Sequence, residues 1–149
     1  KISKEEAYNK INTVINNGLA AEKFEMMVAG LGGPKNILSS YEKDLINTSV
    51  RKDVFSSEEG WIEKIYTREL GLILIELGGG RKQVTDKIDY GVGYDNVLNI
   101  GNEVNSSTPL LSLYSSKNID DNLINKIKAC FIISDKKTQK LSEIFETIN

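Results

Sequence analysis

The sequence lacks histidine entirely and has one cysteine, Cys130, among its 149 residues. Histidine is the commonest general base near neutral pH and the commonest metal ligand, so the most frequent forms of acid–base and metal chemistry are excluded. A single cysteine allows no internal disulfide, and we therefore expect a reducing, cytoplasmic location. We expect no metal site in this chain.

Two further absences concern charge and hydropathy. No run of about 18 apolar residues is present, so the sequence predicts no membrane span. The 19 basic and 21 acidic residues nearly cancel, to a net charge of −2, and no long basic stretch offers a surface for nucleic acid. With 40% hydrophobic residues, the chain is long enough for one domain or slightly more. Because it begins at Lys1 rather than at methionine, we expect a fragment of a longer protein.

The N-terminal region has the pattern of two helices. Ser3 and Glu6 form a capping box, and Gly18 suits a helix end because glycine adopts the left-handed conformation readily. A Gly-Gly-Pro run ends the second helix. Apolar residues recur at helical spacing, at Ala7, Ile11, Val14, Ile15 and Leu19 and then at Ala20, Phe24, Met27, Val28 and Leu31. We predict an antiparallel helix pair, followed by a linker at residues 35–48.

Beyond this linker the pattern changes to short strands mixed with helices. The apolar run at residues 70–77 fits a buried strand or a helix, and a capping Thr67 with a glycine at the end favours the helix. A second helix is predicted at residues 120–131, with Phe131 facing inward. The tail at residues 141–148 fits a helix or a closing strand. Further strands are predicted at residues 50–55, 60–66, 97–101, 103–104 and 109–114.

One loop stands apart, because Gly78, Gly79, Gly80, Arg81 and Lys82 follow the apolar run directly. Glycine backbone N–H groups can point at a phosphate, and the basic pair adds positive charge, so the loop could bind an anion. It fits no P-loop, since no Gly-Lys-Ser/Thr follows at the required spacing. It fits no dinucleotide fingerprint, which needs Gly-x-Gly-x-x-Gly between a strand and a helix. A structural or flexible turn is the other interpretation.

The remaining candidates have simpler structural interpretations. Asp86 and Asp89 could be paired carboxylates for acid–base work, but charged loop residues are more often solvated. Cys130 lies among apolar residues with no histidine to activate it, so we predict a buried structural thiol. We place Trp61 and Tyr66 in the core. The four Ser-Ser pairs are turn residues, and none sits in a Gly-x-Ser-x-Gly elbow. The residues alone provide no self-sufficient catalytic set.

Three phrases together resemble one enzyme family. They are EKFEMMVAGLGGP from Glu22, GWIEKIYTRELGLILIELGGGRKQVTDKIDYGVGY from Gly60, and GNEVNSSTPLLSLYS from Gly101. In order and spacing they are similar to the C-terminal third of the thymidine and pyrimidine-nucleoside phosphorylases. The resemblance covers most of residues 4–134. Within this family, the triple glycine and the IDYGVGY motif of this sequence are closer to the thymidine phosphorylase branch.

The resemblance implies a reversible phosphorolysis, in which thymidine and phosphate give thymine and 2-deoxyribose 1-phosphate. Phosphate is then a co-substrate, and no cofactor is expected. The family's phosphate-binding and pyrimidine-binding residues belong to an N-terminal part without counterpart here, so no catalytic residue carries over and the chain alone is expected to be inactive. Partners would be the pyrimidine deoxynucleoside, phosphate and that N-terminal part, with no nucleic acid and no membrane.

The resemblance also implies an α+β fold. Residues 1–48 would be a helical segment of the large α/β domain, and residues 49–149 an α/β hammerhead related to barrel-sandwich folds. The segment at residues 78–93 would close the cleft, with Gly78, Gly79 and Gly80 permitting a hinge and Arg81 acting as a latch. Lys82 belongs to the same loop. The intact enzyme would be a homodimer, and this piece a monomer.

Two other functions remain open. The turn-rich NIGNEVNSSTPLLSL is reminiscent of lipoyl and biotinyl carriers, which share barrel-sandwich geometry. Those carriers need a lysine at a hairpin tip, and no lysine here sits in such a hairpin. The second alternative is a stand-alone module that binds an anion through the loop from Gly78 to Lys82.

Overall fold

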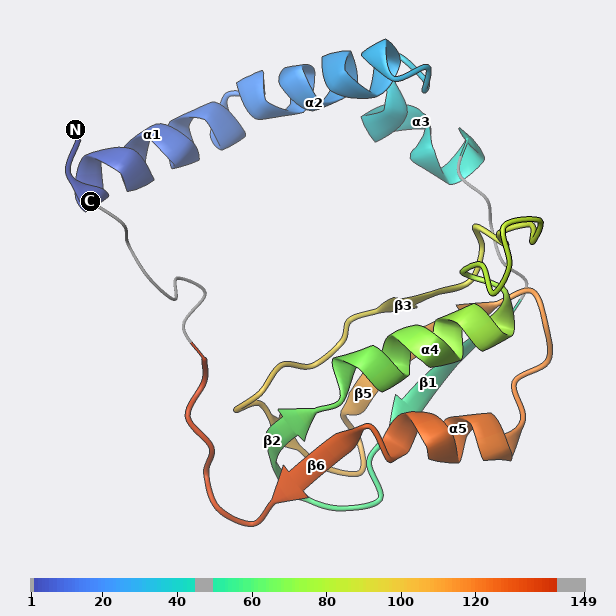
Figure 1. The fold of residues 1–149 in the computed structure, drawn as a ribbon. Helices are drawn as coiled ribbons and strands as arrows, with labels where there is room; N and C mark the ends of the chain where they lie inside the picture. Colours follow the sequence, from blue (N-terminus) through green and yellow to red (C-terminus); the bar gives the residue numbers. More distant parts are fainter. Residues whose placement is uncertain (1, 45–49, 142–149) are drawn as a thin grey trace. The chain divides into compact units, whose positions relative to one another are not determined.

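The computed structural model describes residues 2–44 and 50–141, which contain five helices and six strands (Figure 1). The strands form two small antiparallel sheets, and the predicted α+β class is confirmed. The chain divides into two compact units, an N-terminal unit at Lys1–Asn47 and a C-terminal unit at Thr48–Asn149. No helix among the described residues is long and apolar enough to cross a membrane.

The ends of the first two helices are set by local hydrogen bonds. Helix α1 (Lys4–Asn16) begins as predicted, with the Ser3 hydroxyl accepting from the N–H of Glu6 at 3.1 Å. Gly18 has φ +83° and separates α1 from α2 (Leu19–Gly30). Helix α2 ends where Gly33 N–H donates to the Val28 carbonyl at 2.9 Å, with Gly32 at φ +89°. This is a Schellman ending, which needs a left-handed residue and therefore favours glycine.

Two predictions for this unit are wrong. Helices α1 and α2 follow one another end to end in Figure 1 rather than packing as an antiparallel pair. Only Asn17 and the left-handed Gly18 separate the two helices, and neither helix buries a side chain that would hold a hairpin together. Part of the predicted linker is helix α3 (Ile37–Asp44), whose Leu38 N–H donates to the Glu25 carboxylate at 3.2 Å.

The C-terminal unit contains both sheets. The first has the order β1-β5-β3, formed by Val50–Phe55, Pro109–Ser115 and Gly93–Asp95. The second has the order β4-β2-β6, formed by Glu103–Val104, Gly60–Ile65 and Phe131–Ser134. Helices α4 (Thr67–Leu77) and α5 (Asp121–Lys128) complete the unit. In Figure 1 α4 crosses over the first sheet, where Tyr94 of β3 donates its hydroxyl to the Leu70 carbonyl at 3.2 Å.

Most predicted elements of this unit are present, with five corrections. Strands β3 and β6 were not predicted, and Phe131 opens β6 instead of ending the last helix. Residues 97–101 form no strand, since 97–99 are irregular and a turn follows at 100–101, with Gly101 at φ +80°. Thr67 is the first residue of α4 and makes no cap, since Tyr66 holds the cap position without a side-chain hydrogen bond. Tyr66 is also exposed rather than in the core.

One hydrophobic core holds the C-terminal unit together. Helix α4 contributes Leu70, Ile73 and Leu77, and α5 contributes Ile124 and Ile127. The strands and turns add the other buried members, which are Val54, Ile62, Val104, Leu110, Leu111, Leu113, Ile119, Cys130 and Phe131. The predicted tail element at residues 141–148 lies almost wholly outside the described residues. The assignment of this unit to the α/β hammerhead fold stays a prediction.

Candidate functional site

The segment that joins α4 to β3, residues 78–92, is called the glycine loop below. It leaves the end of α4 and folds back on itself before β3 (Figure 1). At its start Gly79 N–H donates to the Leu74 carbonyl at 2.8 Å and Gly78 N–H to the Ile75 carbonyl at 3.1 Å. This is again a Schellman ending, and Gly78 at φ +107° supplies its left-handed residue. The first glycine is therefore required by the helix end.

The next two glycines are required by close packing. A Cβ on Gly79 would lie 3.0 Å from Cγ1 of Val92, and one on Gly80 would lie 2.6 Å from Cγ1 of Ile75. The Asp89 N–H also donates to the Gly78 carbonyl at 2.8 Å, which ties the two ends of the loop. The base of the loop is thus tightly packed, and the hinge role of Gly78, Gly79 and Gly80 stays a prediction.

Asp86 organises the tip of the loop, residues 81–87. Its Oδ2 accepts from the backbone N–H groups of Lys82 and Gln83, both at 2.9 Å. Its own N–H donates to the Gln83 carbonyl at 3.1 Å. Asp89 similarly accepts from the Gly91 N–H at 3.0 Å. Both carboxylates that were candidates for acid–base work are therefore engaged by the loop's own backbone.

The tip presents cationic and apolar side chains outward. Arg81 and Lys82 are exposed, and within residues 2–44 and 50–141 neither side chain makes a recorded hydrogen bond or ion pair. Val84 of the tip is 92% exposed, and Tyr90, which lies beyond the tip in the same loop, is 75% exposed. Within the described residues Arg81 and Lys82 are therefore available to bind an anionic group through their side chains.

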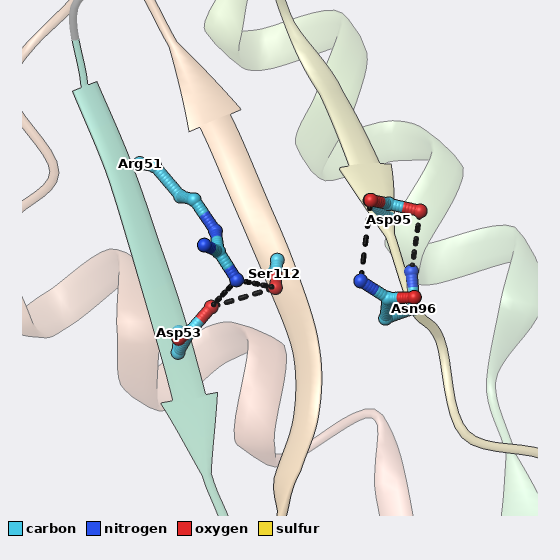
Figure 2. Close-up of polar contacts among 5 residues, drawn as sticks. All are labelled: Arg51, Asp53, Asp95, Asn96 and Ser112. Atoms are coloured by element: carbon cyan, nitrogen blue, oxygen red, sulfur yellow. Dashed lines mark hydrogen bonds and ion pairs between the residues drawn. The ribbon is translucent and has the colours of Figure 1, made fainter.

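A second polar cluster lies on the first sheet and was not predicted from the sequence. Figure 2 shows Arg51 and Asp53 on β1 reaching Ser112 on β5. Ser112 donates its hydroxyl to Asp53 Oδ1 at 2.6 Å, and Arg51 Nη2 donates to the same oxygen at 3.0 Å and to the Ser112 hydroxyl at 3.2 Å. The pairing places Asp53 and Asp95 on either side of Ser112 in register.

This cluster satisfies a buried hydroxyl. Ser112 is only 1% exposed, and a buried hydroxyl without a partner is costly. Figure 2 also shows that Asp95 is engaged by its neighbour, since the Asn96 backbone N–H donates to Asp95 Oδ1 at 2.8 Å and the Asn96 amide to Oδ2 at 3.2 Å. The arrangement stabilises the sheet. No sequence signal identified it, because it depends on strand register across the chain.

Cys130 is buried, as predicted. Its thiol donates to the Lys126 carbonyl at 3.3 Å. Burial raises the pKa of this thiol above its ordinary value, and the nearby negative charge of Glu69 raises it further. Both effects oppose formation of the nucleophilic thiolate. Among the described residues no group of three or more His, Cys, Asp or Glu side chains could hold a metal ion.

The geometry defines a small α+β module with one braced, cationic loop and no nucleophile, base or metal set among the residues described. Its residues 61–134 match the family model of the pyrimidine nucleoside phosphorylase C-terminal domain. The match runs from β2 to β6 and includes the whole glycine loop. The chain therefore carries the C-terminal part of a pyrimidine nucleoside phosphorylase, an enzyme family whose catalytic part is N-terminal to this domain.

Proposed function

We propose that this chain is the C-terminal part of a thymidine phosphorylase, which converts thymidine and phosphate to thymine and 2-deoxyribose 1-phosphate. The match of residues 61–134 supports the family, and the triple glycine with IDYGVGY at residues 88–94 supports the thymidine branch. No cofactor is needed, and a cytoplasmic location fits the single cysteine. The intact enzyme, expressed with its catalytic part, should have a higher kcat/KM for thymidine than for uridine; the reverse preference would contradict the branch.

The chain contributes to this reaction through the tip of the glycine loop. In the proposal, Arg81 extends to the catalytic part when the cleft closes and helps to hold the anionic reactants away from water. The observation that carries this role is an exposed Arg81 on a loop whose base is packed and tied. A side chain on a braced loop reaches its partner with less loss of conformational entropy than one on a loose loop.

The helical N-terminal unit fits the same enzyme. The proposal assigns residues 1–48 to its large α/β domain, because the described helices expose an unusual number of large apolar side chains. Leu31 is 83% exposed, and the others include Tyr8, Ile11, Ile15, Leu19, Phe24, Met26 and Met27. Exposed apolar surface of this extent marks a contact with missing protein. The enzyme would dimerise through its small helical domain, which this chain lacks, and this piece should sediment as a monomer.

Arg81→Ala in the intact enzyme tests the latch. We expect kcat for thymidine phosphorolysis to fall by about a hundredfold, the effect of misplacing bound reactants by about 1 Å. The thermal unfolding midpoint should stay unchanged, since the exposed Arg81 side chain makes no hydrogen bond or ion pair within the described residues. Lys87→Ala, which removes another exposed cation from the same tip, is the control and should leave kcat nearly unchanged. Unchanged turnover in Arg81→Ala would contradict the latch.

The stand-alone alternatives have less support. The N–H groups of Gly78 and Gly79 already donate to the carbonyls of Ile75 and Leu74, and the next donors along the loop, those of Lys82 and Gln83, bind Asp86. The carrier alternative needs a lysine at a hairpin tip, but the turn before β5 reads Asn105, Ser106, Ser107 and Thr108. Titration of this chain with phosphate separates the possibilities. We expect no saturable binding at millimolar phosphate, and no phosphorolysis by the chain alone, whereas binding would support the anion module.

A further inference from the structure

The tip of the glycine loop is tied by one side chain. The base of the loop is held by the Asp89–Gly78 backbone hydrogen bond and by the packing of Gly79 and Gly80. Beyond this base, the side-chain hydrogen bonds recorded for the tip all end on one atom, Oδ2 of Asp86. That oxygen receives two successive backbone N–H groups, those of the two residues that directly follow Arg81.

We infer that Asp86 is a positioning residue whose carboxylate fixes the backbone after Arg81 and thereby the direction in which the guanidinium leaves the loop. The inference rests on the proposed function of Arg81. Two consecutive N–H groups form a small concave donor site for an anion, and a carboxylate binds such a site more strongly than a neutral acceptor does. The loop thus carries its own anion.

This internal anion has a consequence for how the loop meets its partner. Because Asp86 occupies the backbone N–H groups of Lys82 and Gln83, an anionic group of the substrate or of the catalytic part that approaches these two residues meets their side chains and not those donors. Arg81, Lys82 and Lys87 are the exposed cations of the tip, and Arg81 is the one directly followed by the two amides that Asp86 holds. A guanidinium can bind phosphate or carboxylate through two parallel hydrogen bonds, and this geometry requires a fixed direction of approach. Asp86 supplies that direction.

Asp86 can be altered without loosening the base of the loop. Asp89 makes the hydrogen bonds to Gly78 and Gly91, and the packing of Gly79 and Gly80 involves Val92 and Ile75. Replacement of Asp86 should therefore release the tip alone. Asp86→Ala removes the acceptor, and Asp86→Asn keeps an oxygen acceptor in the same place while removing the charge.

Amide hydrogen exchange in this chain tests the first half of the inference. In Asp86→Ala we expect the amides of Lys82 and Gln83 to exchange about tenfold faster, the change that corresponds to loss of about one net hydrogen bond. The Asp89 amide, bonded to the Gly78 carbonyl, should keep its rate. Asp86→Asn should restore part of the protection. Unchanged rates at Lys82 and Gln83 would overturn the inference.

A double-mutant cycle in the intact enzyme tests the second half. If Asp86 acts through Arg81, Asp86→Ala lowers kcat at least tenfold, and Arg81→Ala/Asp86→Ala is no slower than Arg81→Ala alone. Multiplied effects would overturn the inference while leaving the latch intact. A fall in kcat for Arg81→Ala with an unchanged kcat for Asp86→Ala would also overturn the inference and leave the latch intact. Normal turnover in both single variants would instead overturn the proposed role of the loop, together with the part of the inference that depends on it.

Discussion

The two units of this chain differ in what they bury. Helices α1 and α2 bury no side chain, and within the described part of the N-terminal unit only Ile37 is buried, at 7% exposure. The C-terminal unit has a core of 14 buried hydrophobic residues, drawn from two helices and both sheets. Isolated helices of this length are marginal in water, so most of their stability must come from packing against a partner.

The difference separates a unit with its own hydrophobic core from one whose helices bury almost nothing. The family match of residues 61–134 falls within the unit that has its own core. The N-terminal unit has well-formed helix ends but exposes most of its large apolar residues. Local hydrogen bonds thus specify its helices, and few buried side chains support them.

The largest expected effect comes from the core. Replacement of Ile62, which is 0% exposed, by Ala should lower the free energy of unfolding by about 3–4 kcal/mol. Ile11→Ala should change the same free energy by less than about 0.5 kcal/mol. Urea unfolding followed by the fluorescence of Trp61, the only tryptophan, reports on the C-terminal unit. An equal loss for Ile11→Ala would mean that the two units share one core and would remove the distinction.

A smaller effect is expected from two glycines of α4 and the glycine loop. Gly80→Ala places a Cβ 2.6 Å from Cγ1 of Ile75 and should cost about 1–3 kcal/mol through overpacking. Gly71→Ala, in an exposed position of α4 with no atom within 4 Å, should gain up to about 1 kcal/mol through helix propensity. Thermal unfolding of both variants measures the difference. Equal midpoints would show that the base of the loop is loose.

The features that could be predicted from the sequence are those with local causes. The Ser3 cap, the Gly18 and Gly78 helix ends and the extent of α4 depend on residues within about one helical turn. The three glycines of the loop were identified as unusual, but their packing against Val92 and Ile75 could not be, because it depends on how the loop returns to β3.

The features that were missed depend on distant pairing. Ser112 meets Asp53 because β1 and β5 pair in one register, and nothing near either residue specifies that register. Strands β3 and β6 are short and become strands by pairing with β5 and β2. The prediction of an antiparallel helix pair was wrong for a different reason. An amphipathic pattern indicates an apolar face but does not say which surface covers it.

A pH effect distinguishes the interior of the C-terminal unit from its surface. Burial, and to a lesser extent the charge of Cys130, raises the pKa of Tyr94, whose hydroxyl donates to the Leu70 carbonyl. Above the ordinary value of 10.0 the unfolded chain loses this proton while the folded chain keeps it, so the stability from Tyr94 falls as pH rises. Tyr94→Phe should be about 1 kcal/mol less stable at pH ~8. The unfolding free energy of the variant should approach the parent value above pH 10.0. A difference between the two unfolding free energies that stays constant with pH would contradict the raised pKa.

The smallest effect compares equivalent helix caps in the two units. Asp120 accepts from the Leu123 N–H at 2.8 Å at the start of α5, as Ser3 does from Glu6 in α1. Asp120→Ala should lower the unfolding free energy seen by Trp61 by about 1 kcal/mol, because α5 packs into the core. Ser3→Ala should leave that transition unchanged and lower helix content in circular dichroism, because α1 is held by local contacts. A shift of the Trp61 transition in Ser3→Ala would show that helix α1 supports the core, and the two units would then have to be treated as one.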